Sequence, residues 1–133
     1  MGRPAKQTKG ANTITYPGFF NLPKAMLNDP GYIALPHRAK SLLTDLGEQY
    51  NGRNNGDLCA SITLMKKRGW KSRDQLSKAI KELLVHNWIE QTRQGGLNMG
   101  PTLYAFTWQP IHECGGKLEV KPTTLPSRKL INR

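Results

Sequence analysis

Residues 61–93, SITLMKKRGWKSRDQLSKAIKELLVHNWIEQTR, contain the pattern that decides the fold. Ser61 and Ser72 each precede a run with apolar residues at helical spacing, and serine is favoured there because its side chain accepts a bond from a free backbone N–H. Gly69 suits the end of the first run, since glycine readily adopts the left-handed conformation found after helices. From Trp88 the composition is that of a β-strand. The stretch therefore predicts a short helix, a tight turn, a second helix and a strand.

The second predicted helix, residues 72–87, has one apolar and one polar side. At about 100° per residue, a set of apolar side chains falls on one face of this helix. That set is Leu76, Ala79, Ile80, Leu83 and Leu84. The opposite arc holds Lys71, Asp74, Gln75, Lys78, Lys81 and Glu82, with Arg73 and Ser77 at its flank. We expect the helix to bury the apolar face and to expose a basic, hydrogen-bonding one.

Two more helices and a strand are predicted before this stretch. Apolar residues recur at helical spacing over 36–50, and the polar run NGRNNG that follows marks the end of that helix. A shorter helix is expected from about Pro23. Residues 57–60 suit a short strand at the edge of a sheet.

A β-hairpin is predicted after the second helix. Trp88 to Gln94 and Thr102 to Trp108 have the composition of strands, and the loop GGLNMGP between them is rich in turn residues. Aromatic residues alternate along the second strand at Tyr104, Phe106 and Trp108. Such a stripe is more often core than a platform for base stacking, so we expect these rings to be buried.

These elements predict an α+β domain over residues 16–110, with a three-helix core, a β-hairpin and an extension at each end. Residues 1–15 are basic and contain almost nothing apolar, so they are expected to form a flexible arm. In the arm, Gly2-Arg3-Pro4 resembles the centre of an AT-hook, which places arginine in the minor groove; a solvated, charged start of the chain is the alternative. Residues 111–133 predict an extended C-terminal tail, attached near Leu118 and Val120.

The chain is strongly basic. Its 133 residues suffice for one ordinary domain, and 20 Lys and Arg against nine Asp and Glu give a net charge of +11 and a pI near 10.0. Between Cys59 and Asn87 lie seven of these basic residues and two acids. Each phosphate that a basic side chain neutralises releases counterions, so the charge favours a polyanionic partner, with nucleic acid as the leading candidate.

Other classes of function have less support. No apolar run approaches the ~20 residues needed to span a bilayer, and no apolar leader follows Met1, so we expect no membrane partner and a cytoplasmic location. Cys59 and Cys114 are isolated, and only His112 lies near Cys114, which is no recognisable zinc or disulfide pattern. No phosphate-binding Gly-rich loop, HExxH motif or catalytic set is evident, so we predict a non-enzymatic protein without cofactor or metal.

Residues 72–96, SRDQLSKAIKELLVHNWIEQTRQGG, resemble the recognition helix and first wing strand of winged helix-turn-helix regulators. The resemblance extends over roughly residues 36–108 and implies a winged helix-turn-helix fold in which the hairpin is the wing. The positions that face DNA in that family match Ser72, Arg73, Gln75, Ser77 and Lys78. Several shorter segments resemble small helix-turn-helix proteins of prophages and integrative elements. They are NNGDL, RGW, RQGG, LYAFTW and CGGKLEVKPTT. Asn87 replaces the glycine of many relatives, but asparagine tolerates the left-handed conformation needed there.

The predicted DNA-binding residues divide into base readers and phosphate contacts. Arg bonds guanine through two parallel donors and Gln pairs bidentately with adenine, so Arg73 and Gln75 are expected to read bases. Phosphate contacts are expected from Lys66, Lys67, Arg68, Lys71, Lys78 and Lys81. Asp74 could accept from cytosine or orient Arg73 or Lys78, but we favour a simple electrostatic interaction with the helix N-terminus. The set is completed by Arg3 in the arm and by Arg93, Gln94 and Asn98 at or near the wing tip, where an ordinary hairpin turn is the alternative.

The predicted function is sequence-specific binding of double-stranded DNA by the helix 72–87 and the wing 93–101, in transcription regulation of a phage or mobile genetic element. We expect a nucleoid location. A homodimer is compatible with this function, although no long helix or heptad seam is present to mediate it. The alternative is a mobile-element factor that binds a host replication or defence protein. RNA binding is a third hypothesis, weakened because no RNP-like aromatic sheet or GXXG loop is evident.

Overall fold

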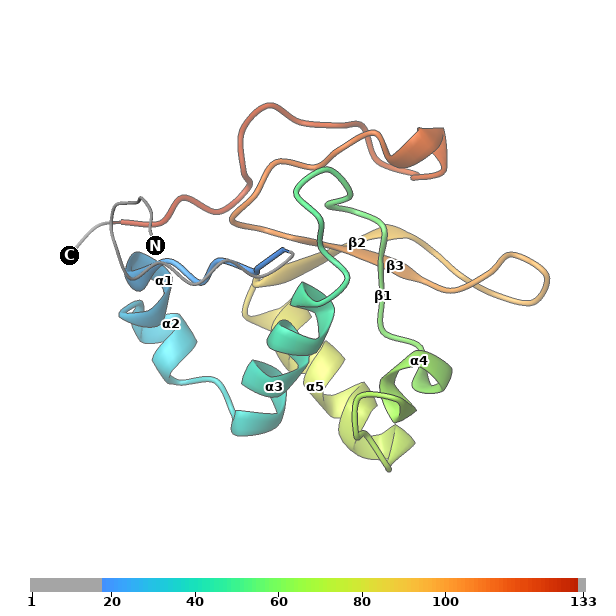
Figure 1. Cartoon of the computed structure of the whole chain (residues 1–133), viewed down its shortest axis with the longest axis horizontal. Coiled ribbons are helices and arrows are strands. Elements are labelled where there is room, and N and C mark those ends of the chain that lie inside the picture. The colour runs from blue at the N-terminus through green and yellow to red at the C-terminus, as the bar shows by residue number, and fades with distance from the viewer. Residues whose placement is uncertain (1–17, 132–133) are drawn as a thin grey trace, which may run out of the picture.

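The computed structural model describes residues 18–131 and has a mixed α+β architecture (Figure 1). Its helices surround one face of a three-stranded antiparallel sheet with strand order β1-β3-β2. The helices are α1 (Lys24–Leu27), α2 (Pro30–Ile33), α3 (His37–Gly47), α4 (Ile62–Lys66) and α5 (Arg73–Val85). The strands are β1 (Leu58–Cys59), β2 (Ile89–Arg93) and β3 (Leu103–Phe106), and a 3-10 turn, η1, follows at Cys114–Gly116.

The helix–turn–helix part of the chain begins and ends as its sequence predicts. Ser61 and Ser72 are the N-caps of α4 and α5, and their hydroxyls accept from the backbone N–H groups of Leu64 (3.4 Å) and Gln75 (3.2 Å). Gly69, in the turn between these helices, has the left-handed φ of 98°. Asn87 has a φ of 61° just after α5, which confirms that asparagine adopts the left-handed conformation there.

The N-terminal region contains one helix more than predicted. The helix expected from Pro23 is the single turn α1, and α2 follows it directly. Asp29 caps α2 through its carboxylate, which accepts from the Gly31 N–H at 2.8 Å, and Pro30 occupies the first helical position, where its missing N–H costs nothing. The Asp-Pro pair is therefore a start signal that the apolar spacing did not reveal.

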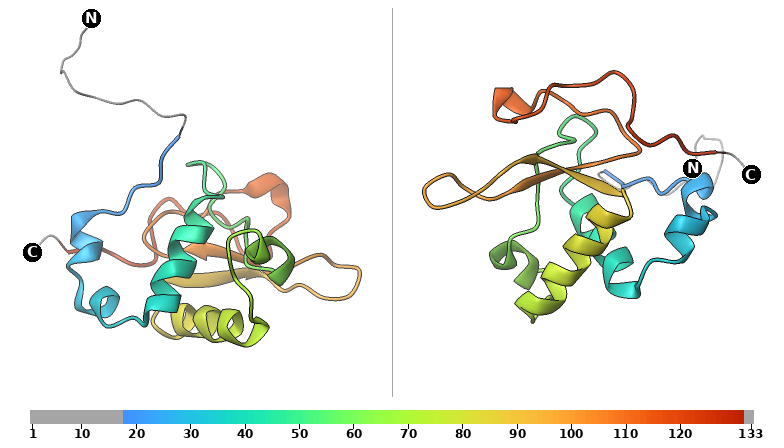
Figure 2. Two further views of the ribbon diagram at one scale, coloured as in Figure 1. Left: turned by 60° about the horizontal axis from the view of Figure 1, so that its bottom comes forward. Right: turned by 180° about the vertical axis from the view of Figure 1, so that it is seen from behind.

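Strand β3 lies at the centre of the sheet. It pairs with β1 through Leu58 and Tyr104 and with β2 through Ile89 and Phe106, so β1 is an edge strand as predicted. The aromatic rings of Tyr104, Phe106 and Trp108 are buried, which confirms their assignment to the core. The intervening side chains are buried too, because the C-terminal segment crosses the face of the sheet opposite to the helices (Figures 1 and 2).

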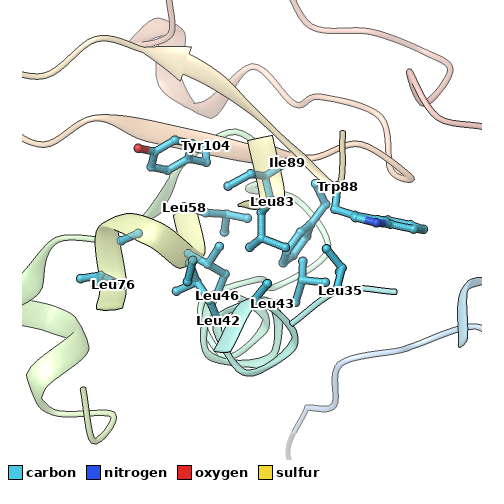
Figure 3. Close-up of a cluster of buried hydrophobic side chains, with 14 of the residues drawn as sticks. Leu35, Leu42, Leu43, Leu46, Leu58, Leu76, Leu83, Trp88, Ile89 and Tyr104 are labelled. Carbon is cyan, nitrogen blue, oxygen red and sulfur yellow. The ribbon is translucent and has the colours of Figure 1, made fainter. Parts of the chain in front are cut away.

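The apolar core lies between the helices and the sheet. Figure 3 shows Leu42, Leu43 and Leu46 of α3 pointing toward Leu76 and Leu83 of α5, beneath the sheet. The N-terminal segment adds Phe20 to this core. Its ring lies so close to α3 that a Cβ at Gly47 would come within 2.3 Å of it, so only glycine fits at that position.

The C-terminal segment is extended and held on the body of the domain. The Glu119 N–H donates to the Thr92 carbonyl of β2 at 2.8 Å, and Leu118 packs where a Cβ at Gly56 would collide with it at 2.6 Å. Further along, the Arg128 guanidinium stacks on the Trp88 ring at 3.5 Å. The attachment expected near Leu118 is thus present, and a second one exists at Arg128.

The buried side chain of Asn55 continues the pairing along β3 before the start of β1. Its Oδ1 accepts from the Phe106 N–H at 2.7 Å, and its Nδ2 donates to the carbonyls of Phe106, Gln109 and Pro110 at 2.9–3.1 Å. These four backbone groups lie at or beyond the end of β3, where β1 no longer runs alongside. One amide therefore satisfies a set of groups that would otherwise lack partners.

We predict that Asn55→Ala lowers the free energy of unfolding by about 2–4 kcal/mol, because a buried polar group left without a partner costs about 1–3 kcal/mol and water can reach some of the four. Urea unfolding followed by tryptophan fluorescence measures the change. The exposed Asn21→Ala change is the matched control and should stay within about 0.5 kcal/mol. Equal effects of the two substitutions would contradict this role of Asn55.

Candidate functional site

The polar side of α5 is open to solvent. Arg73, Ser77, Lys78 and Lys81 are exposed, whereas the apolar side of the helix is buried against the core. Where the C-terminal segment reaches α5, it does so beyond the helix end, through bonds from Arg128 to the His86 and Asn87 carbonyls. The cationic side of α5 is therefore not covered by the described part of the tail.

Most of the predicted phosphate contacts have no acidic partner. Of the seven basic residues between Cys59 and Asn87, Arg68 and Lys78 form ion pairs. Within residues 18–131, no ion pair involves the other five, which are Lys66, Lys67, Lys71, Arg73 and Lys81. All five are exposed and lie on α4, α5 or the residues between and directly after them. The positive charge of this part of the chain is therefore exposed and mostly unpaired.

Asp74 and Lys78 form an exposed i,i+4 ion pair, with 3.0 Å between Nζ and Oδ2. Asp74 also lies in the first turn of α5, where a carboxylate interacts favourably with the helix dipole. The two roles that the sequence left as alternatives are thus compatible. An exposed pair of this kind contributes little stability, so Lys78 remains accessible to another anion.

Arg38 of α3 is a functional candidate that the sequence did not reveal. Its Nε donates to Glu82 Oε1 at 2.9 Å and its Nη2 donates to Oε2, while its Nη1 donates to Gln75 Oε1 at 3.3 Å. The hydrogen bond to Glu82 raises the pKa of Arg38, and the same bond lowers the pKa of Glu82. No local pattern could have shown this, because the partners lie 44 residues apart in the chain.

The expectation that Glu82 belongs to the exposed arc of α5 was wrong. Its side chain is 20% exposed and faces α3, where Arg38 pairs with it. Gln75 leans the same way, since its carbonyl oxygen accepts from Arg38. The exposed polar face of α5 is therefore narrower than the helical spacing of its residues predicted, and a larger share of its side chains is basic.

A second buried carboxylate holds the turn between α4 and α5. Asp45 of α3 accepts from the Trp70 indole N–H at 2.7 Å and from the Arg68 Nε at 3.2 Å. Asp45 is only 9% exposed, so both donors are needed to offset its removal from water. Asp45 thereby holds Arg68 in place, and the two terminal nitrogens of Arg68 take no part in this contact.

Arg93, Gln94 and Asn98 lie on the loop side of the β2–β3 hairpin. Arg93 is the last residue of β2, where its Nη2 donates to the Pro101 carbonyl at 3.1 Å and its Nε is buried without a partner in the described chain. The Gln94 side chain bonds within the hairpin, to Gln91 and to the Gly95 carbonyl. Asn98 is the predicted residue that is exposed at the tip, with a left-handed φ of 62°.

One predicted DNA-binding residue, Arg3, lies outside the described residues. Cys59 and Cys114 are free thiols, and burial raises the pKa of Cys114. Over residues 18–131, no three His, Cys, Asp or Glu side chains are grouped so that they could hold a metal ion, and no helix is long and apolar enough to cross a membrane.

Comparison with known proteins gave no relative to guide the assignment. No protein-family model matches the chain, and neither the curated proteins nor the solved structures contain a significant match to it. The interpretation of the basic surface therefore depends on its geometry and charge, together with the resemblance seen in the sequence.

We predict that Glu82→Gln lowers stability at neutral pH and has a smaller effect in acid. The folded-state pKa of Glu82 is lowered by Arg38, so the pair stabilises the fold above the ordinary carboxyl value of about 4.5 and is lost as pH falls through the lower folded value. Urea unfolding of both proteins at pH 7 and pH 3 measures the difference.

The control for this experiment is the same substitution in an Arg38→Ala background. Without the guanidinium, the Glu82→Gln effect should lose most of its pH dependence, because the hydrogen bond that does most to lower the pKa of Glu82 is absent. An effect of equal size at both pH values in the wild-type background would show that the pair does not contribute to stability in the way described.

Proposed function

We propose that the chain is a winged helix-turn-helix protein that binds double-stranded DNA, with α5 in the major groove and the β2–β3 hairpin as the wing. Its proposed role is transcription regulation in a phage or mobile genetic element, the setting that the resemblance of its sequence implies. α4, the turn at Gly69 and α5 would form the helix–turn–helix unit.

The order of elements supports the proposed fold. A helix (α3), a short edge strand, two helices separated by a turn and an antiparallel hairpin follow one another as in the winged helix-turn-helix regulators that residues 72–96 resemble. Figure 2 shows the loop of the hairpin projecting beyond the sheet on the side where α4 and the start of α5 lie. A helix and a projecting hairpin on one side of a domain are suited to adjacent grooves of a duplex.

One observation carries the functional proposal, namely the exposed and unpaired cations of α4, α5 and the residues between them. Because the apolar side of α5 is buried, these charges all lie on surfaces that a polyanion can approach. An α-helix fits the major groove of B-form DNA, and lysines and arginines around it neutralise the phosphates on either side. A surface of this kind gives affinity and orientation, and the exposed polar residues of α5 supply base contacts.

The geometry favours Arg73 over Gln75 as the main reader of bases. Arg73 is exposed and has no ion pair within the described chain, so its guanidinium is free to donate two parallel bonds to guanine. The carbonyl oxygen of Gln75 already accepts from Arg38. Bidentate pairing of Gln75 with adenine would have to share that oxygen with Arg38 or displace the bond.

We predict that Lys81→Ala weakens the binding of all duplexes about equally and lowers the slope of log affinity against log salt by about 0.9, the value for one phosphate contact. Selection of bound fragments from random duplex DNA supplies the target, and titrations at several salt concentrations give the slope. Lys121→Ala removes the same charge from the C-terminal segment and should leave affinity and slope nearly unchanged.

We predict a different result for Arg73→Ala. Loss of a bidentate base contact should cost about 1–3 kcal/mol on the selected sequence and should relax the preference at one base pair, with little effect on other duplexes. Repeating the selection with the variant measures this. Uniform weakening on every sequence would instead assign Arg73 to a phosphate.

A protein-docking role is the second candidate, and the wing tip is the observation that favours it. Leu97 is 91% exposed and Met99 is 63% exposed, an unusual pair of apolar side chains at the end of a hairpin. The hypothesis is a mobile-element factor that binds a host replication or defence protein. Failure of the random-duplex selection to enrich any sequence, together with saturable binding of a purified host protein that Leu97→Ser abolishes, would favour this candidate over DNA binding.

A further inference from the structure

A surface hollow of about 370 Å³ lies between α3, the turn that joins α4 to α5 and the start of α5. We call it the α3–α5 hollow. The residues that matter for its chemistry are Arg38, Ser41, Arg68, Trp70, Lys71 and Gln75. The left view of Figure 2 shows the turn running beside the start of α5, with α3 adjacent. Three cations therefore meet around one concave space, Arg38 from α3 and both Arg68 and Lys71 from the turn between α4 and α5.

The lining of the hollow offers hydrogen-bond donors and positive charge. Among the described residues, no acidic side chain lines it, although two carboxylates lie directly behind it. Asp45 binds Arg68 through Nε alone, so the two terminal nitrogens of Arg68 keep their donors. The carbonyl oxygen of Gln75 is occupied by Arg38, which leaves its amide N–H₂ as the free end. Lys71 adds an exposed ammonium that forms no ion pair within residues 18–131.

The carboxylates behind the hollow also fix its cations. Glu82 holds Arg38 through two hydrogen bonds, and Asp45 holds both Arg68 and the Trp70 ring that forms a wall of the hollow. Side chains held in this way lose less conformational entropy when a ligand binds. A guanidinium anchored from one side, with free donors on the other, is suited to the planar, bidentate recognition of an oxyanion.

We infer that the α3–α5 hollow binds one phosphate diester of the duplex backbone, through Arg68, Lys71 and the Gln75 amide, with Arg38 contributing charge. This inference rests on the proposed function and extends it, because it places a single fixed phosphate at the N-terminal end of α5. A phosphate held there sets how far the helix enters the groove and at which base pair it begins to read. The remaining lysines contact the backbone without this constraint.

The test combines protein variants with duplexes that carry one uncharged methylphosphonate at each backbone position in turn. At one position, the modification should weaken the wild-type protein about three- to tenfold, the range between an exposed and a desolvated charge pair. The same modification should have a clearly smaller effect on Arg68→Ala and on Lys71→Ala, since each variant lacks one of the cations that hold the phosphate. Lys121→Ala, on the C-terminal segment, should reproduce the wild-type pattern at every position.

The inference is overturned by one result. At every backbone position, the methylphosphonate would weaken Arg68→Ala and Lys71→Ala by the same factor as the wild-type protein, while both variants still bind the unmodified duplex. Circular dichroism checks that Arg68→Ala is folded. Lys71→Ala gives the same information without removing the Asp45 partner, so misfolding of one variant does not prevent a decision.

A second measurement applies if the wild-type chain binds no duplex. Inorganic phosphate is then titrated while the NMR signal of the Trp70 indole N–H is followed. A saturable shift that is weaker in Lys71→Ala supports an anion site, and only the proposed DNA binding is then contradicted. No shift up to the highest phosphate concentration overturns the site as well.

Discussion

The burial of Leu76, Ala79 and Leu83 is the constraint on which the rest of the structure depends. Together with the half-buried Ile80 and Leu84, these side chains form the apolar stripe of α5, which packs against α3 and beneath the sheet (Figure 3). Because an α-helix has about 3.6 residues per turn, this packing also determines the direction in which every polar residue of α5 points. The exposed cations are thus a consequence of core packing.

Local signals predicted the elements, and long-range contacts account for what was missed. The caps Ser61 and Ser72, the glycine of the turn and the alternating aromatic residues of β3 act within a few residues, so their effect could be predicted from the sequence. The pairing of Arg38 with Glu82 could not, because it joins two helices whose relative placement follows from the core. The bond from Arg93 to the Pro101 carbonyl could not be predicted for a related reason, since the composition of a strand does not specify how the loop beyond it is arranged.

The two carboxylates next to the basic surface lower its net positive charge. Asp45 and Glu82 neutralise part of the charge of Arg68 and Arg38, so the surface is less positive than its sequence total indicates. They also hold those guanidinium groups in defined positions. A disordered cluster of lysines attracts a polyanion without orienting it, whereas anchored arginines favour one placement of an anion over others. In the proposed function, specificity of register would come from the anchored residues and most of the salt-dependent affinity from the free ones.

Both ends of α5 are held by side chains from distant parts of the chain. At its start, Asp45 fixes the turn through Trp70 and Arg68, and Ser72 caps the first turn of the helix. Beyond its end, Arg128 donates to two backbone carbonyls, stacks on Trp88 and pairs with Asp29 at 3.5 Å. Cations at a helix C-terminus are stabilising, so this contact fastens α5 as well as the C-terminal segment. These contacts at both ends oppose rotation of α5. In the proposed function, a bound duplex would therefore adapt its groove width and bend to the spacing between α5 and the β2–β3 hairpin.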